Sequence, residues 1–151
     1  MNTKFDISQV TKDDWRELGF YYEINDEKNK WNFRGSKKGL ESFAKILFEF
    51  SENKNNEKMF EHDHYGPYSY LKIQCYSEPL ISKNSIMGPL LDLKKLGEII
   101  KKNILLSKLG ETIIVDKEFS SQNEYTIEIV IEEDNFDPSQ ADPLLINENR
   151  S

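Results

Sequence analysis

The densest group of potential metal ligands in the sequence is the run from Glu61 to His64. In an extended segment, His62 and His64 would lie on the same side, which is the geometry of a histidine pair that binds a metal. The chain has no third histidine, whereas a catalytic zinc is typically held by three protein ligands and a water. Because Gly66 and Pro67 follow, the run is more typical of a polar turn. A small metal-dependent enzyme built on the two histidines is the alternative hypothesis.

Cys75 is the only cysteine and would be the natural candidate for a thiol nucleophile. It alternates with Leu71 and Ile73, which predicts a place on the buried face of a strand, where a thiol serves as a small apolar filler. A single cysteine also excludes a disulfide within the chain and is typical of a reducing compartment.

Signals for phosphate binding and for known catalytic motifs are weak. Residues Ser36 to Gly39 follow Gly35 and open a predicted helix, whose N-terminus could bind an anion. Lysines at such a position are more often simply solvated. No G-x-S-x-G, Walker A or G-x-G-x-x-G pattern occurs in the sequence. We therefore expect a protein without enzymatic activity and without a cofactor.

The net charge of −7 is distributed unevenly along the chain. Residues 111–151 contain 11 acidic and 2 basic side chains, a balance of −9, whereas residues 1–110 contain 16 acidic and 18 basic ones, a balance of +2. Such a field repels nucleic acids and anionic membranes and speeds the encounter with a basic partner. Acidic residues also serve simply to keep a small domain soluble. The charge therefore favours a protein partner over nucleic acid or membrane.

The N-terminal residues show no targeting pattern. They contain neither a basic leader before an apolar run nor a small-residue cleavage site, and the longest apolar stretches are well below the roughly 20 residues of a membrane span. We expect a cytoplasmic protein.

Apolar residues recur with two different periods along the chain, which predicts both helices and strands. Spacings of three and four indicate two amphipathic helices, over 37–51 and 90–106, the first capped by Ser36. Alternation indicates a hairpin over 18–24 and 31–33 and strands over 68–76, 112–119 and 124–132. The order is ββαβαββ, so we predict an α+β fold with a mostly antiparallel sheet of about five strands and two helices on one face.

The chain length predicts a single domain over residues 1–134. From Asn135 onward the sequence is acidic and contains Pro138 and Pro143 among polar residues. Residues 135–151 are therefore expected to form a partly disordered tail, although Leu144 to Ile146 could dock on the domain.

The face of the predicted sheet opposite the helices is the candidate functional surface. Because side chains alternate across a strand, turning the aliphatic residues toward the helices leaves tyrosines and carboxylates on the other face. Tyrosines supply large contact areas in protein interfaces, and carboxylates steer a basic partner. The predicted partner-binding residues are Tyr68, Tyr70, Tyr76, Asp116, Glu118, Glu128 and Glu132, with Tyr21 and Glu23 completing the face from the first strand.

Two other interpretations of this face stay open. Tyrosine and glutamate are ordinary residues at the outward positions of a strand. The face could also join copies of the chain in a self-associating structural or adaptor protein, so the oligomeric state is left open.

Several short segments carry a resemblance to a known class of proteins. They are Trp31–Gly35 leading to Gly39-Leu40, His62–Pro67, and Phe136–Pro138 with Asp142-Pro143. With these segments the layout resembles small bacterial immunity proteins that accompany polymorphic or contact-dependent toxins. The resemblance implies an acidic, non-enzymatic inhibitor that binds a cognate toxin inside the producing cell. It assigns no binding residue.

Overall fold

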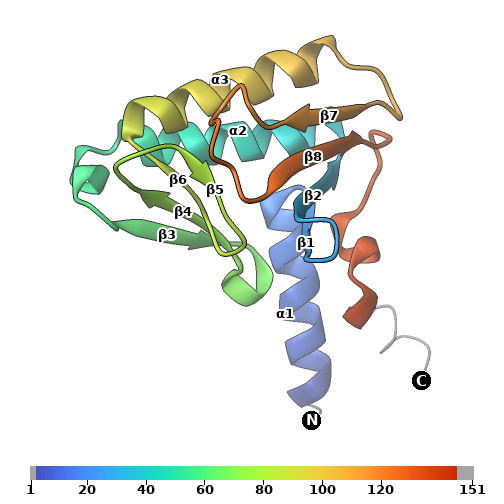
Figure 1. The fold of residues 1–151 in the computed structure, drawn as a ribbon. Coiled ribbons are helices and arrows are strands. Elements are labelled where there is room, and N and C mark those ends of the chain that lie inside the picture. The colour runs from blue at the N-terminus through green and yellow to red at the C-terminus, as the bar shows by residue number, and fades with distance from the viewer. Residues whose placement is uncertain (1–2, 146–151) are drawn as a thin grey trace.

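A computed structural model describes residues 3–145 and shows an α+β fold, as the sequence predicts. Over these residues the chain forms three long α-helices, eight strands and three short 3₁₀ helices, and residues 143–145 are also helical (Figure 1). The helices are α1 (Thr3–Leu18), α2 (Lys37–Glu52), α3 (Leu90–Leu106), η1 (Lys54–Glu57), η2 (Pro67–Ser69) and η3 (Pro138–Ala141). The strands are β1 (Tyr21–Asn25), β2 (Lys30–Gly35), β3 (His62–Tyr65), β4 (Leu71–Cys75), β5 (Leu80–Ile81), β6 (Ile86–Gly88), β7 (Thr112–Val115) and β8 (Thr126–Ile131).

The strands form two mixed sheets, so the prediction of one mostly antiparallel sheet is wrong. The first sheet has the order β1-β2-β8-β7, with β2 and β8 parallel. The second has the order β3-β4-β6-β5, with β4 and β6 parallel. Strands β3, β5 and β6 could not be predicted from the sequence, because strands of 4, 2 and 3 residues contain too few alternating positions to show a period.

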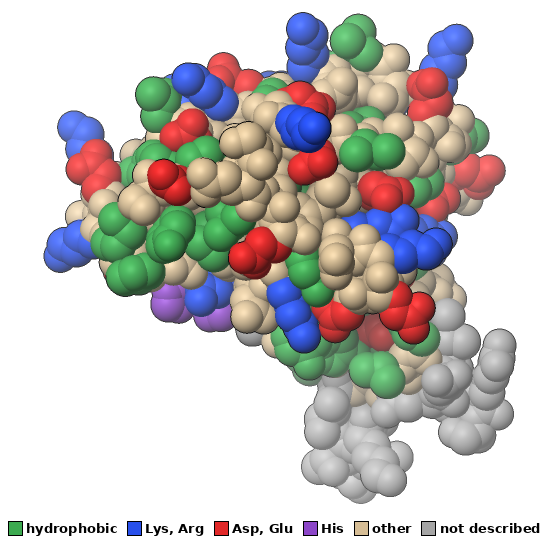
Figure 2. Space-filling model, viewed as in Figure 1, with side chains coloured by type: hydrophobic (Ala, Val, Ile, Leu, Met, Phe, Trp, Pro, Cys, Tyr) green, Lys and Arg blue, Asp and Glu red, His purple; other side chains and the backbone are tan. Residues whose placement is uncertain are grey.

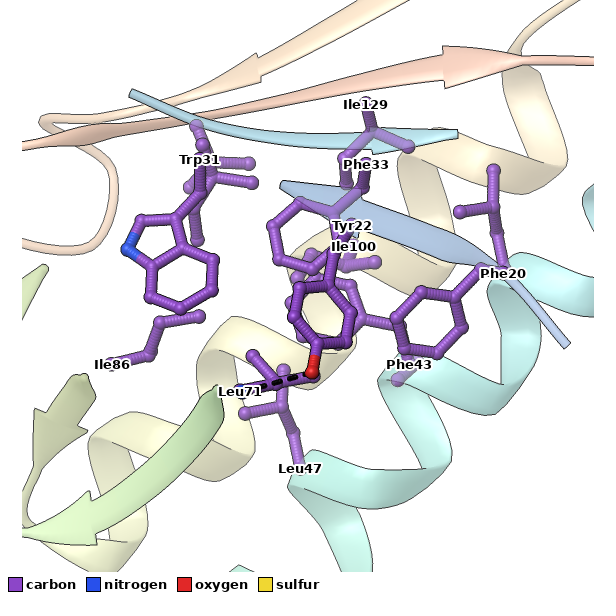
Figure 3. Close-up of a cluster of buried hydrophobic side chains, with 14 of the residues drawn as sticks. Phe20, Tyr22, Trp31, Phe33, Phe43, Leu47, Leu71, Ile86, Ile100 and Ile129 are labelled. Carbon is purple, nitrogen blue, oxygen red and sulfur yellow. Dashed lines mark hydrogen bonds between the residues drawn. The ribbon is translucent and has the colours of Figure 1, made fainter. Parts of the chain in front are cut away.

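Helices α2 and α3 pack against each other and against the strands, close to the predicted ranges. Helix α2 begins after Ser36, whose Oγ accepts a hydrogen bond of 3.0 Å from the Gly39 amide, as a capping residue should. The ring of Phe43 in α2 stacks on Phe33 of β2, with 4.3 Å between the ring centroids (Figure 3). Both predicted helices are therefore confirmed.

Helix α1 has no counterpart in the sequence analysis, which assigns no element before Leu18. The helix points away from the two sheets and lies beside η3 (Figure 1). Trp15 is 2% exposed, whereas Val10 on the same helix is 58% exposed. Within residues 8–18, the part of the helix whose burial is described, Trp15 is the only fully buried side chain, which is too few to give a periodic apolar stripe. None of the helices within 3–145 combines the length and the apolar character needed to cross a membrane.

Two buried aromatic side chains of the β1–β2 hairpin join the first sheet to the second. The Tyr22 hydroxyl lies 3.0 Å from the Tyr65 carbonyl oxygen and 2.9 Å from that of Pro67, and it accepts a hydrogen bond of 3.2 Å from the Leu71 amide (Figure 3). Burial raises the pKa of Tyr22 to about 12, so the hydroxyl keeps its proton at neutral pH.

Trp31 makes the second link through its indole N–H, which donates to the Ser82 carbonyl at 2.8 Å. Next to it, the Ile81 carbonyl accepts hydrogen bonds of 3.0 Å from the amides of Glu124 and Tyr125, just before β8. The short strand β5 is thus tied to the first sheet at two points.

Replacing Tyr22 by phenylalanine should destabilise the fold. The Tyr22→Phe substitution keeps the ring but leaves the buried Leu71 amide without its acceptor, at a cost of about 1–3 kcal/mol. Urea denaturation followed by circular dichroism measures this loss. Tyr70→Phe is the matched control, because the Tyr70 side chain is 63% exposed and its change should cost almost nothing. Equal stability of the two variants would contradict the proposed link.

Candidate functional site

Two of the predicted outward carboxylates are Glu128 in β8 and Glu132 just after it. They lie on the side of the strand opposite the residues that face the helices, but each is paired with a basic side chain. Ile127, Ile129 and Ile131 are buried, which confirms the alternation of this strand. Glu128 forms an ion pair of 2.8 Å with Lys30, and Glu132 one of 2.8 Å with Arg34. Acidic and basic side chains are also interspersed on the face that Figure 2 draws. These two glutamates therefore carry little unpaired negative charge.

The other predicted binding residues do not join Glu128 and Glu132 on one sheet face. Tyr68 and Tyr70 precede β4, which begins at Leu71 in the second sheet, so strand alternation does not place them. Tyr76 follows β4 and lies 6.0 Å from the ring of Phe60. Asp116 and Glu118 follow the end of β7 in a turn where the Asp116 amide donates to the Glu118 carboxylate at 3.3 Å. The prediction of one continuous face is wrong, and the binding role of each residue stays a prediction.

The two histidines lie on an edge strand rather than in the predicted turn. In β3, which pairs only with β4, the rings of His62 and His64 are 5.1 Å apart and both residues are exposed. The prediction that they share one side of an extended segment is confirmed. Within residues 3–145, no group of three or more His, Cys, Asp or Glu side chains is arranged to hold a metal ion.

Cys75 occupies the position that the sequence predicts, at the end of β4 and 5% exposed. Burial raises the pKa of its thiol, and the nearby carboxylate of Glu57 raises it further. The thiol donates a hydrogen bond of 3.4 Å to the Glu57 carbonyl. A thiol with a raised pKa is a poor nucleophile, so Cys75 has the properties of a core residue.

A cleft of about 440 Å³ lies where α1, β1, η2 and the C-terminal segment meet. We call it the aromatic cleft, because tryptophan and tyrosine rings form much of its wall. Such a hollow is large enough for a small ligand or for a side chain of a partner. It is lined by Trp15, Tyr21, Tyr22, Glu23, Ile24, Tyr68, Tyr70, Asn84, Asp142, Pro143 and Leu144.

Asp142 holds the floor of the aromatic cleft together. Its Oδ2 accepts a hydrogen bond of 2.9 Å from the Trp15 indole N–H and one of 2.6 Å from the Tyr68 hydroxyl. Its Oδ1 accepts a hydrogen bond of 2.9 Å from the Leu144 amide. One carboxylate that is 2% exposed thus connects α1, η2 and the C-terminal segment.

Tyr68, which donates to Asp142, has a left-handed backbone. The residue has a φ of 66°, a conformation that is uncommon for an aromatic residue. Its ring lies 6.4 Å from Trp15 and 5.7 Å from Tyr70. Strained backbone of this kind persists where surrounding contacts hold it and is concentrated at functional sites.

Tyr21 points to the side of the sheet opposite α2 and α3, as predicted, but Trp15 of α1 covers it. Its ring packs 5.0 Å from Trp15, and the side chain is 5% exposed. Burial raises the pKa of Tyr21, and the negative charges of Glu23 and Asp142 raise it further. The charge of Arg34 acts in the opposite direction but does not outweigh these causes.

Residues 135–145 of the predicted tail pack on α1 and form one wall of the cleft. Arg16 donates to both carboxylate oxygens of Asp137, with the shortest contact at 3.0 Å. The Arg34 guanidinium lies 5.4 Å from the centre of the Phe136 ring, and Leu145 is 4% exposed. Residues 146–151 of that tail lie outside the described residues.

The cleft could not be predicted from the sequence, although Tyr68 and Tyr70 are among the predicted binding residues. Trp15 and Asp142 are 127 residues apart in the chain, and neither lies in an element that the sequence predicts. The available signal was the pair of tyrosines, Tyr68 and Tyr70, that follows Gly66-Pro67, a position where a turn exposes aromatic rings. The lining combines aromatic rings with the carboxylates of Glu23 and Asp142.

No protein family, curated protein or solved structure matches the chain. The candidate site is therefore identified from its geometry alone.

The ion pair between Arg16 and Asp137 should make the C-terminal wall sensitive to acid. Burial alone would raise the pKa of the Asp137 carboxyl, but the hydrogen bonds from Arg16 and Ser139 outweigh burial and lower it below the ordinary value of 3.8. Because its pKa is lowered in the folded protein, the carboxyl stabilises the fold at pH values above its ordinary pKa. This contribution is lost as the pH falls below that pKa.

Thermal unfolding of an Asp137→Asn variant at several pH values measures this effect. The variant should be less stable than the wild type at pH 7, by about 0.2–1 kcal/mol for a partly exposed pair. The difference should shrink as the pH falls below about 4. Asp134→Asn is the control at an exposed carboxyl in the same stretch. A difference that is constant over this pH range would exclude the ion pair as its cause.

Proposed function

We propose that the protein is a non-enzymatic binding protein, and that it neutralises a basic bacterial toxin inside the cell that makes it. The observation that carries the proposal is the aromatic cleft, with Tyr68 and Tyr70 exposed by 41% and 63% at its mouth. Large exposed aromatic residues beside a formed hollow are typical of the central contacts of protein interfaces. The toxin as partner comes from the resemblance to immunity proteins.

The acidic residues favour a basic partner. The chain has a net charge of −7, and Glu23 is exposed beside the tyrosines of the cleft. Negative charge around an interface raises the association rate with a positively charged partner, more strongly at low salt. Of the acids predicted from the sequence, Glu118 is exposed, whereas Glu128 and Glu132 are paired with Lys30 and Arg34. We assign affinity to the cleft and steering to the exposed acids.

The test measures both protection and affinity. The protein is co-expressed with a candidate toxin encoded by the adjacent gene, and restored growth of the host reports neutralisation. Binding of the purified pair is then measured by surface plasmon resonance. Tyr70→Ala should weaken binding by about 30-fold, the effect of a contact worth about 2 kcal/mol. The charge reversal Glu118→Lys should mainly slow association, with a larger effect at low salt.

Tyr76→Ala is the matched control for the loss of an aromatic ring, because the Tyr76 ring lies tilted against Phe60 and is not among the lining residues, so assigning affinity to the cleft leaves Tyr76 without its predicted binding role. It should retain full affinity. Unchanged affinity of Tyr70→Ala and of a Tyr68→Ala, Tyr70→Ala double variant would remove the cleft as the binding surface. Absence of protection by the wild type against the adjacent gene product would argue against the toxin as partner.

A further inference from the structure

Among the described side chains, no cation pairs with the carboxylate of Asp142, although a buried charge normally has such a partner. It is 2% exposed, and its three hydrogen bonds come from neutral groups of Trp15, Tyr68 and Leu144. None of the ion pairs formed within residues 3–145 includes Asp142. Asp137, a few residues earlier, is in contrast paired with Arg16. A buried carboxylate is costly unless hydrogen bonds and an opposite charge compensate for the lost water.

The rings in front of Asp142 form a surface that attracts cations. Tyr68 and Tyr70 lie 5.7 Å apart at the mouth, and Trp15 lies 6.4 Å behind Tyr68. The faces of tryptophan and tyrosine rings carry partial negative charge and bind guanidinium and ammonium groups. The hydrogen bond from the Tyr68 hydroxyl to a carboxylate increases the electron density of that ring. The aromatic cleft therefore offers ring faces and negative charge together.

The remaining lining residues add a second negative charge and no positive one. Glu23 is exposed at the cleft, and neither lysine nor arginine is among the lining residues. The cleft is also open enough for a long side chain, at about 440 Å³. Of the two basic side chains, arginine suits this site better, because its planar guanidinium stacks on rings and gives up its water more readily than an ammonium.

We propose that the aromatic cleft binds an arginine side chain of the partner protein, stacked against Tyr68 and Tyr70 and held in the field of Asp142 and Glu23. This inference rests on the proposed function and names the chemistry that the site would recognise. In this proposal the cleft selects a side chain that carries a positive charge and also packs on its aromatic rings.

The two tryptophans allow a direct test with a small probe. The Trp15 indole N–H donates to Asp142 at the floor of the cleft, whereas that of Trp31 donates to Ser82 between the sheets. In a ¹⁵N-labelled sample, the two indole signals report on the cleft and on the core, and a Trp31→Phe sample assigns them. N-acetyl-arginine amide is titrated into the full chain at constant ionic strength. The Trp15 signal should shift to saturation, while the Trp31 signal stays in place.

N-acetyl-citrulline amide is the matched control ligand, because it has nearly the same shape without the charge. Its effect on the Trp15 signal should be at least about tenfold weaker at equal concentration. Tyr70→Ala and Glu23→Gln should each weaken arginine binding, and both residues are exposed, so these variants should keep the fold. Asp142→Asn should weaken it most, and an unchanged Trp31 signal would show that this variant is folded.

Equal shifts with arginine and citrulline, or no shift at all, would overturn the proposal. N-acetyl-lysine amide that binds as well as the arginine compound would overturn the preference for a guanidinium. If the arginine probe fails while Tyr70→Ala still weakens the protein partner, the cation site is wrong and the proposed function stands. If the probe binds as expected while the partner is unaffected by Tyr70→Ala, the cation site stands and the cleft is not where that partner binds.

Discussion

The structure depends on two aromatic side chains whose rings are buried and whose polar atoms form hydrogen bonds. Tyr22 and Trp31 lie on neighbouring strands of one hairpin, and each reaches a backbone group of the other sheet. Each short sheet alone is a weak unit, because strands of a few residues bury little surface. The rings supply shared apolar area, while the hydrogen bonds fix how the sheets meet. The Tyr22 hydroxyl in addition holds the segment from Tyr65 to Leu71, which carries the exposed tyrosines.

The aromatic cleft lies at the edge of the core, where core rings of Trp15, Tyr21 and Tyr22 meet more exposed parts of the chain. Tyr21 and Glu23 come from the hairpin, Tyr68 and Tyr70 from the turn that Tyr22 fixes, and Asp142 from the C-terminal segment. A rigid scaffold that presents functional side chains on turns and terminal segments is a common division of labour in proteins. The buried carboxylate is an expensive feature for a surface that only covers the core. This free-energy cost has an explanation if the site binds a charged group, as proposed.

Parts of this architecture could be predicted from the sequence, and the reasons for success and failure are physical. Helices α2 and α3 each bury one long apolar stripe, so their period shows in the sequence. The alternation of β8 and the burial of Cys75 follow from the same logic. Alternation could not place Tyr68, because it lies in a 3₁₀ turn with a positive φ. The cleft stayed hidden because Trp15 and Asp142 meet only in the folded chain, across 127 positions.

The C-terminal wall of the cleft gives the protein a point of vulnerability that its core does not share. Residues 133–135, just before this wall, are exposed and lie outside any helix or strand. Cleavage by a protease at this link would leave both sheets and the two central helices intact. The severed wall would then be retained through the contacts of Asp137 with Arg16 and of Asp142 with Trp15 and Tyr68, and its loss would open the cleft. A single cut there would therefore affect the cleft without removing a strand from either sheet.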